Sequence, residues 1–278
     1  MSRWPLAAFV ALAAATIAAF FFVQHLKVTT PLVNGFPAPI PAAIDPLHGG
    51  VCTVHTHGGP ERVSFRAMKI SFYLQNRADS VDVYMVDSDG ERVAQIGFGV
   101  QMAIAKRHRF IWDGRLDDGA IAPDGAYDIQ VSLIGQGRTF LISNQRTGVV
   151  EPVTVDTTVP VPVVTAVHPA TLAASAPAPV TIRYSGTDGL RPKILIYRLA
   201  AGAGAGARAG AGARLRLVKR YSATSRGGAS VWDGTLAGRR PAPPGRYIVG
   251  LALTDRACTT GRSPVTPAAA PRAVVTVA

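Results

Sequence analysis

The chain has few of the residues from which catalytic and metal sites are usually built. Its 278 residues include only two cysteines and six histidines, and aromatic residues make up 7%. The common enzyme signatures are missing: there is no G-x-S-x-G elbow, P-loop, H-E-x-x-H motif or dinucleotide fingerprint. We therefore expect no catalytic residue and no cofactor, and a function other than that of an enzyme.

Sustained helical periodicity is also missing between residues 60 and 156. Apolar and polar residues alternate instead over residues 70–74 and 81–85, which predicts strands. Residues 180–184 and 194–196 repeat that pattern in the second half. Gly and Pro are plentiful, with 28 and 21 residues, as expected for short strands joined by many turns. The fold class is therefore predicted to be all-β.

Two stretches of the chain carry the same residues 120 positions apart and align without a gap. A match at fixed spacing indicates two copies of one supersecondary unit. We expect one domain over residues 48–156 and a second over residues 165–278, joined by a linker at 157–164. The matching residues are Trp112, Asp113, Gly114, Pro123, Gly125 and Tyr127 in the first copy, and Trp232, Asp233, Gly234, Pro243, Gly245 and Tyr247 in the second.

Each residue of the repeated motif has a role in folding. The Trp ends a strand and can bury a large apolar surface, and the Asp can accept hydrogen bonds from backbone N–H groups of the next turn. Gly and Pro suit the turns, and the Tyr begins the returning strand with its hydroxyl near loop backbone. No acid or base partner recurs beside Asp113 or Asp233. The motif is therefore interpreted as structural.

This motif resembles the FlgD-type immunoglobulin-like domain, a small bacterial β-sandwich, over roughly residues 65–150 and 178–258. The resemblance implies two tandem immunoglobulin-like β-sandwiches. It also implies a spacer or accessory module of an exported bacterial protein. The namesake's role in the flagellar hook cap is not carried over, because a membrane anchor is incompatible with passage through the export channel.

The N-terminus predicts such an anchor. Residues 6–23 are apolar except for Thr16, just long enough to cross a bilayer, and Arg3 lies in the short segment 1–5 before them. We expect a single-pass signal anchor in the cell membrane with a cytoplasmic N-terminus. The alternative is a cleaved signal peptide, which the bulky residues 20–22 disfavour. The Pro-rich segment 24–47 is expected to form an extended stalk.

Residues 48–57 hold a possible metal site, because three of the six histidines and one cysteine fall within them. Imidazole and thiolate groups are ligands for zinc and copper, but this spacing is not that of a standard structural site. We therefore expect no metal. If a site exists, its candidate ligands are His48, Cys52, His55 and His57.

Cys52 and Cys258 lie near opposite ends of the folded region. An oxidising compartment would permit a disulfide between them, which would tie the first domain to the last strands of the second. Two free thiols or an intermolecular bridge are equally compatible with the spacing.

Charge is divided unequally along the chain. Residues 1–156 contain 13 basic and 14 acidic residues, whereas residues 157–278 contain 16 basic and 3 acidic residues. The Ala/Gly tract at 200–214 has little to bury and is expected to be disordered.

The main prediction is a non-catalytic spacer, scaffold or interaction module at the cell surface, anchored in the membrane and contacting another surface protein. One alternative is binding of an anionic wall polymer or polysaccharide by the basic second domain. Another is that the chain is the accessory part of a larger exported enzyme. Nucleic-acid binding is not expected, since the basic domain offers neither a reading helix nor interleaved aromatics.

Overall fold

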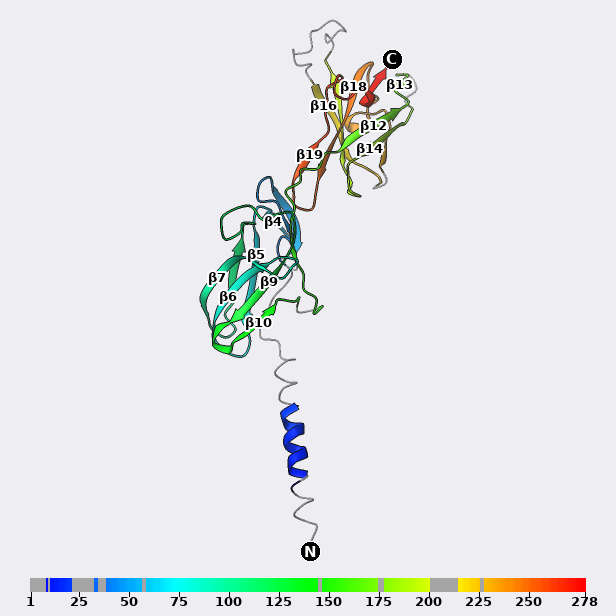
Figure 1. The fold of residues 1–278 in the computed structure, drawn as a ribbon. Coiled ribbons are helices and arrows are strands. Elements are labelled where there is room, and N and C mark those ends of the chain that lie inside the picture. Colours follow the sequence, from blue (N-terminus) through cyan, green and yellow to red (C-terminus); the bar gives the residue numbers. More distant parts are fainter. Residues whose placement is uncertain are drawn as a thin grey trace.

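In its described residues, the computed structural model consists mostly of strands in several sheets, with one α-helix (Figure 1). This agrees with the all-β prediction. The Ala/Gly tract at 201–214 and His57 lie outside the described residues. The structure describes residues 9, 11–21, 33–34, 39–56, 59–144, 147–174, 178–200, 215–225 and 228–278.

The strands between residues 33 and 155 form a first unit with one core. A three-stranded sheet has the order β1-β5-β8, and a larger sheet has the order β2-β11-β9-β6-β7 with β10 paired to β9. Alternate residues of β6, such as Val81 and Val83, are fully buried in the core that lies between the sheets. The elements are β1 (Val33–Asn34), β2 (Ala43–Ile44), β3 (Val51–Thr56), β4 (Gly59–Ser64), β5 (Met68–Leu74), β6 (Asp79–Val86), β7 (Arg92–Met102), β8 (His108–Trp112), β9 (Gly125–Leu133), the 3-10 turn η1 (Ile134–Gln136), β10 (Arg138–Leu141) and β11 (Val153–Val155).

The strands between residues 163 and 278 form a second unit with a separate core. Its sheets repeat the plan of the first, with the orders β12-β14-β17 and β13-β20-β18-β15-β16, and β19 paired to β18. The elements are β12 (Val163–His168), β13 (Thr171–Leu172), β14 (Val180–Ser185), β15 (Lys193–Leu199), β16 (Leu215–Ser222), β17 (Ala229–Trp232), η2 (Ala237–Arg239), β18 (Gly245–Thr254), β19 (Thr260–Arg262), η3 (Pro271–Ala273) and β20 (Val274–Val277).

The Trp and Tyr of the repeated motif occupy equivalent places in the two cores. Trp112 is 2% exposed and Trp232 is fully buried. Their rings pack on Tyr127 and Tyr247, with centroids 5.1 and 5.6 Å apart. The indole Nε1 of Trp112 donates to the carbonyl of Arg115 at 2.8 Å, as Trp232 does to Thr235 at 2.7 Å. Each indole therefore contributes apolar burial to its core while its polar edge binds the next turn.

The turns that follow the two Trp residues are closed in the same way. The hydroxyls of Tyr127 and Tyr247 donate to the carbonyls of Pro123 and Pro243, at 2.8 and 2.7 Å. Gly114 and Gly234 adopt φ of 73° and 69°, in the left-handed region that favours glycine. The Asp of each motif accepts the N–H two residues later, at Arg115 and Thr235. These shared contacts explain why the motif residues recur together.

The proline-rich segment before residue 48 departs from the expected extended stalk. Ile40 exchanges backbone hydrogen bonds with Lys69, and β2 pairs in parallel with β11 at the edge of the larger sheet. Ile44 and Asp45 are fully buried. The described residues 39–47 are therefore part of the first unit, because their backbone groups find partners in its strands.

The expected transmembrane anchor over residues 6–23, and with it the cell-membrane location, is wrong. The described parts of the chain contain no helix long and apolar enough to cross a membrane.

Candidate functional site

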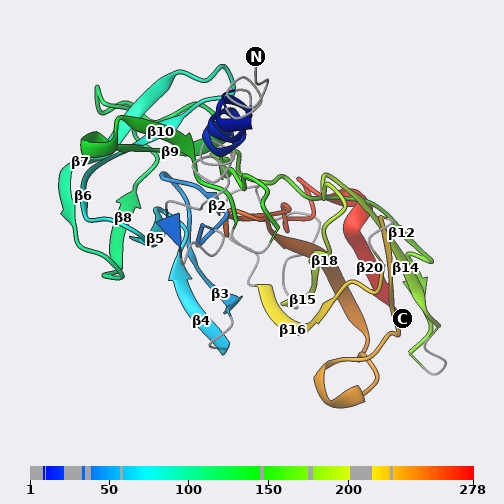
Figure 2. The same ribbon diagram turned by 90° about the horizontal axis from the view of Figure 1, so that it is seen from below.

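The two units meet at a junction built from three short pieces of chain. The β3–β4 hairpin is a separate two-stranded sheet and lies on the side of the first unit that faces the second (Figures 1 and 2). Residues 39–50 lead into this hairpin. The third piece is the turn between β18 and β19, residues 255–259, which reaches from the second unit to the first. These pieces carry the residues that the two units share.

A disulfide joins Cys52 on β3 to Cys258 in the β18–β19 turn, with the Cα atoms 6.0 Å apart. The bond links positions 206 residues apart and connects the two units covalently. Around it, Val63 and Phe65 are buried with Cys258, and Ile40 and Val54 pack against them. This cluster is a third and smaller apolar core that contains side chains from both units.

Asp45 forms the polar centre of the junction. Its carboxylate is fully buried and accepts the backbone N–H groups of Leu47 and His48 at 2.9 and 2.8 Å. The other oxygen accepts the hydroxyl of Thr259 from the second unit at 2.6 Å, and His48 Nδ1 lies 3.4 Å from it. The N–H of Gly50 also donates to the carbonyl of Cys258 at 3.2 Å. A buried carboxylate needs such donors, so Asp45 favours the joined arrangement.

Local hydrogen bonds hold the β18–β19 turn in the shape that presents Cys258 and Thr259. The N–H of Thr259 donates to the carboxylate of Asp255 at 2.8 Å, and Cys258 has a φ of 60°. Burial raises the pKa of Asp255, with a further increase from the neighbouring carboxylates of Asp156 and Asp45. Three carboxylates therefore share the junction, and backbone hydrogen bonds from Thr259 and Ala257 only partly counter the rise in the pKa of Asp255.

The linker is fixed to the end of the first unit by Asp124, which follows Pro123 of the repeated motif. Its carboxylate accepts the N–H and hydroxyl of Thr157 at 2.8 Å each, and the hydroxyl of Thr158 at 3.0 Å. Burial alone would raise the pKa of Asp124, but these hydrogen bonds lower it below its ordinary value. Further along, Pro160 packs against Gly261 of β19, where no side chain would fit.

The candidate metal ligands are not brought together. Cys52 is part of the disulfide, His48 lies beside Asp45, and His55 lies on β3. His57 lies outside the described residues. Among the residues that the structure describes, no group of three His, Cys, Asp or Glu side chains could hold a metal ion.

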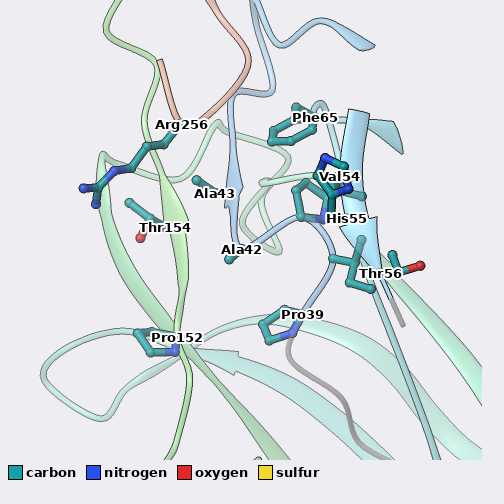
Figure 3. Close-up of a pocket in the computed structure, with 12 residues that line it drawn as sticks. Pro39, Ala42, Ala43, Val54, His55, Thr56, Phe65, Pro152, Thr154 and Arg256 are labelled. Atoms are coloured by element: carbon teal, nitrogen blue, oxygen red, sulfur yellow. The ribbon is translucent and has the colours of Figure 1, made fainter. Parts of the chain in front are cut away.

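A groove of about 520 Å³ opens beside the junction (Figure 3). Pro39, Val54 and Phe65 give it an apolar lining, and Thr154 and His55 add polar groups. Arg256 reaches it from the β18–β19 turn of the second unit. Among the described residues that line the groove there is no carboxylate, and Arg256 supplies a positive charge.

Sequence reasoning identified the two cysteines and His55 but missed Asp45, Thr259 and Arg256. Asp45 and Thr259 are 214 positions apart, and no local pattern relates them. One signal was present: Asp45 precedes Pro46 and a Gly-Gly pair, a composition typical of a side-chain-capped turn.

The chain is similar to flagellar proteins over part of its length. The FlgD Ig-like domain family model matches residues 61–137. The basal-body rod modification protein FlgD of Escherichia coli (strain K12) is 39% identical over 70 residues, covering 25% of this chain and 29% of that protein. Its counterpart from Salmonella typhimurium is 27% identical over 131 residues, covering 47% of this chain and 51% of that protein. The chain thus spans about half the length or less of these curated relatives.

Among solved structures, chicken CNTN1 FN1-FN3 domains align with 76% of this chain and 73% of that chain, at 13% identity. The TM-score of 0.31 is too low to establish a shared fold. The family match covers the first Trp-Asp-Gly motif and the Tyr that follows it, which are the residues that carried the resemblance in the sequence. Residues 61–137 of this chain are therefore a FlgD-type immunoglobulin-like domain.

Proposed function

We propose that this chain is a non-enzymatic, extracytoplasmic scaffold or protein-interaction module. The observation that carries the proposal is the FlgD-type domain at residues 61–137, since such a domain suggests a scaffold or interaction module. The junction described above combines a groove, a disulfide and a buried carboxylate, which are features of a binding surface and of a rigid connection.

The second unit is proposed to be another immunoglobulin-like β-sandwich of the same type. The shared sheet plan, the buried Trp232 and the bond from Tyr247 to Pro243 support this assignment. In this account the two sandwiches, clamped at the junction, present the groove beside Cys52 and Cys258 to a protein partner.

The location outside the cytoplasm is supported by the disulfide, because such bonds persist in oxidising compartments. No membrane anchor is needed for this proposal. The exclusion of a hook-cap role depended on the anchor and therefore lapses with it. The relatives match over half their length or less, so a role like that of the rod modification proteins is one version of the scaffold proposal.

The proposal can be tested in bacterial cells that express the full chain with a photo-reactive amino acid at position 55 on β3. The expected result is a specific cross-linked protein adduct in the extracytoplasmic fraction, with both cysteines resistant to alkylation until they are reduced. The matched control carries the photo-reactive group at position 98, which is exposed on β7 away from the junction. Free thiols in that fraction would contradict the proposed extracytoplasmic location. Equal yields of adduct from positions 55 and 98 would contradict the proposal that the groove binds the partner.

A further inference from the structure

We propose that the outer face of the larger sheet in the second unit binds a linear acidic polysaccharide. The contact is made by three cations, Lys193, Arg220 and Arg262, which we call the basic row. This inference rests on the proposed extracytoplasmic location, since it assigns a partner available there, but it concerns a surface away from the groove.

Strand register places the basic row on one face. Lys193 of β15 lies opposite Ala252 of β18, and Ala252 lies opposite Arg262 of β19. Cross-strand partners point to the same side of a sheet. The neighbouring positions Ile194 and Leu251 are buried in the core, so Lys193 and Arg262 project from the opposite, outer face.

Arg220 extends the row onto the edge strand. Lys193 is paired with Ser222 of β16, and Arg220 is two residues from Ser222 and therefore on the same face. The three side chains are exposed. Because neighbouring strands lie about 4.8 Å apart, the row extends roughly 15 Å from β19 to β16.

Acidic residues do not neutralise this surface. Beyond residue 156 the chain contains only Asp188, Asp233 and Asp255. Asp233 is paired with Lys219 at 2.5 Å, and Asp255 lies in the β18–β19 turn at the junction. In the described parts of the chain, no ion pair involves a member of the basic row. Its positive charge is therefore available to an external anion.

The groups around the row favour a sugar polymer over other polyanions. Ser222, Thr254 and Thr260 are exposed, and Thr254 lies two residues beyond Ala252 on the same face. The hydroxyls of Thr254 and Thr260 hydrogen-bond each other at 2.7 Å. Their remaining donor and lone pairs, together with the Ser222 hydroxyl, can bond the hydroxyls of a glycan while the cations bind its carboxylates. A nucleic acid is disfavoured by the compartment in which the disulfide forms.

The test measures binding of the full oxidised chain to fluorescently labelled alginate, a linear polyuronate, at low salt. The variant Lys193→Ala/Arg220→Ala/Arg262→Ala is expected to bind at least about tenfold more weakly, because three exposed ion pairs are lost. Binding of the unmodified chain should fall steeply with added salt. The matched control, Arg183→Ala/Arg240→Ala/Arg272→Ala, removes three exposed basic residues elsewhere in the same unit and should bind within about twofold of the unmodified chain.

Several results would overturn the assignment. These are absence of alginate binding at low salt, equal loss in the two triple variants, and stronger binding to phosphatidylglycerol vesicles or to neutral dextran than to alginate. None of them would affect the cross-linking result at position 55 or the state of the cysteines, so this inference can fail while the scaffold proposal stands.

Discussion

The two units share an interior but differ in their surfaces. Both bury a Trp against a Tyr and close the following turn on a proline carbonyl. Around this common centre, the first unit carries the hairpin and most of the groove lining, whereas the second has 16 basic residues against 3 acidic ones, counted from residue 157. The same buried contacts therefore occur in two units whose surface charge and loops differ.

The largest effect is expected from removing either indole. Trp112→Ala and Trp232→Ala should each lower the unfolding free energy of their own unit by about 3–5 kcal/mol, since each empties a large site in a closed core. Chemical denaturation followed by circular dichroism measures this loss. Phe98→Ala serves as the control, because Phe98 is 79% exposed and its loss should cost less than about 0.5 kcal/mol. If only one of the two Trp variants lost less than about 1 kcal/mol of unfolding free energy, the cores of the two units would not be equivalent.

The next largest loss of unfolding free energy is expected from removing the Cys52–Cys258 disulfide. The variant Cys52→Ser/Cys258→Ser should lose about 2–4 kcal/mol of unfolding free energy, because the bond restricts the unfolded chain over a long loop. Urea titrations of the variant and of the reduced unmodified chain should agree. If the reduced chain is as stable as the oxidised one, the two units are not coupled through this bond.

A smaller and matched effect is expected at the two tyrosines. Tyr127→Phe and Tyr247→Phe each remove one hydrogen bond to a proline carbonyl and keep the ring, so each should cost about 0.5–1.5 kcal/mol. Thermal unfolding of both variants tests whether the two turns are equally important. A cost confined to one variant would show that the motif is maintained by different forces in the two units.

The smallest expected effect is the pH dependence of the stabilisation that the Lys219–Asp233 pair gives the second unit. Burial would raise the pKa of Asp233, but hydrogen bonds from Lys219 and Thr235 hold it below its ordinary value of 3.8. A carboxyl whose pKa is lower in the folded protein stabilises it above the unfolded pKa, and the contribution disappears as the pH falls through the folded value. Lys219→Met should therefore reduce stability at pH 7 by under about 1 kcal/mol and have less effect near pH 2. An equal loss at both pH values would contradict this pairing.

Much of the fold was predictable because its determinants are local. Alternation marked the strands, and the repeated Trp-Asp-Gly motif marked two equivalent units. The folded position of residues 39–47 could not be predicted, since proline density is equally compatible with an extended chain and with an edge of a sheet. The 18-residue apolar run, with Arg3 before it and bulky residues at its end, favoured an anchor, but no described helix is long and apolar enough to cross a membrane.

The site was less predictable than the fold because it depends on contacts between distant residues. The sequence allowed a Cys52–Cys258 bond among three possibilities, but Asp45 and Thr259 meet only once both units are folded. The groove likewise needs Arg256 from one unit and Phe65 from the other. Tertiary arrangement creates such a site, and no short motif encodes it.

The central claim is that the two units are held in one fixed arrangement. It is tested most directly by measuring the distribution of distances between the units in the oxidised chain. Spin labels attached through non-natural amino acids at positions 101 and 272, both exposed, leave the two cysteines intact. Double electron–electron resonance should give a single narrow distribution of distances between the two labels. The reason is that the disulfide, the Asp45–Thr259 hydrogen bond and the linker contacts fix the units together. A broad distribution in the oxidised chain would contradict this account.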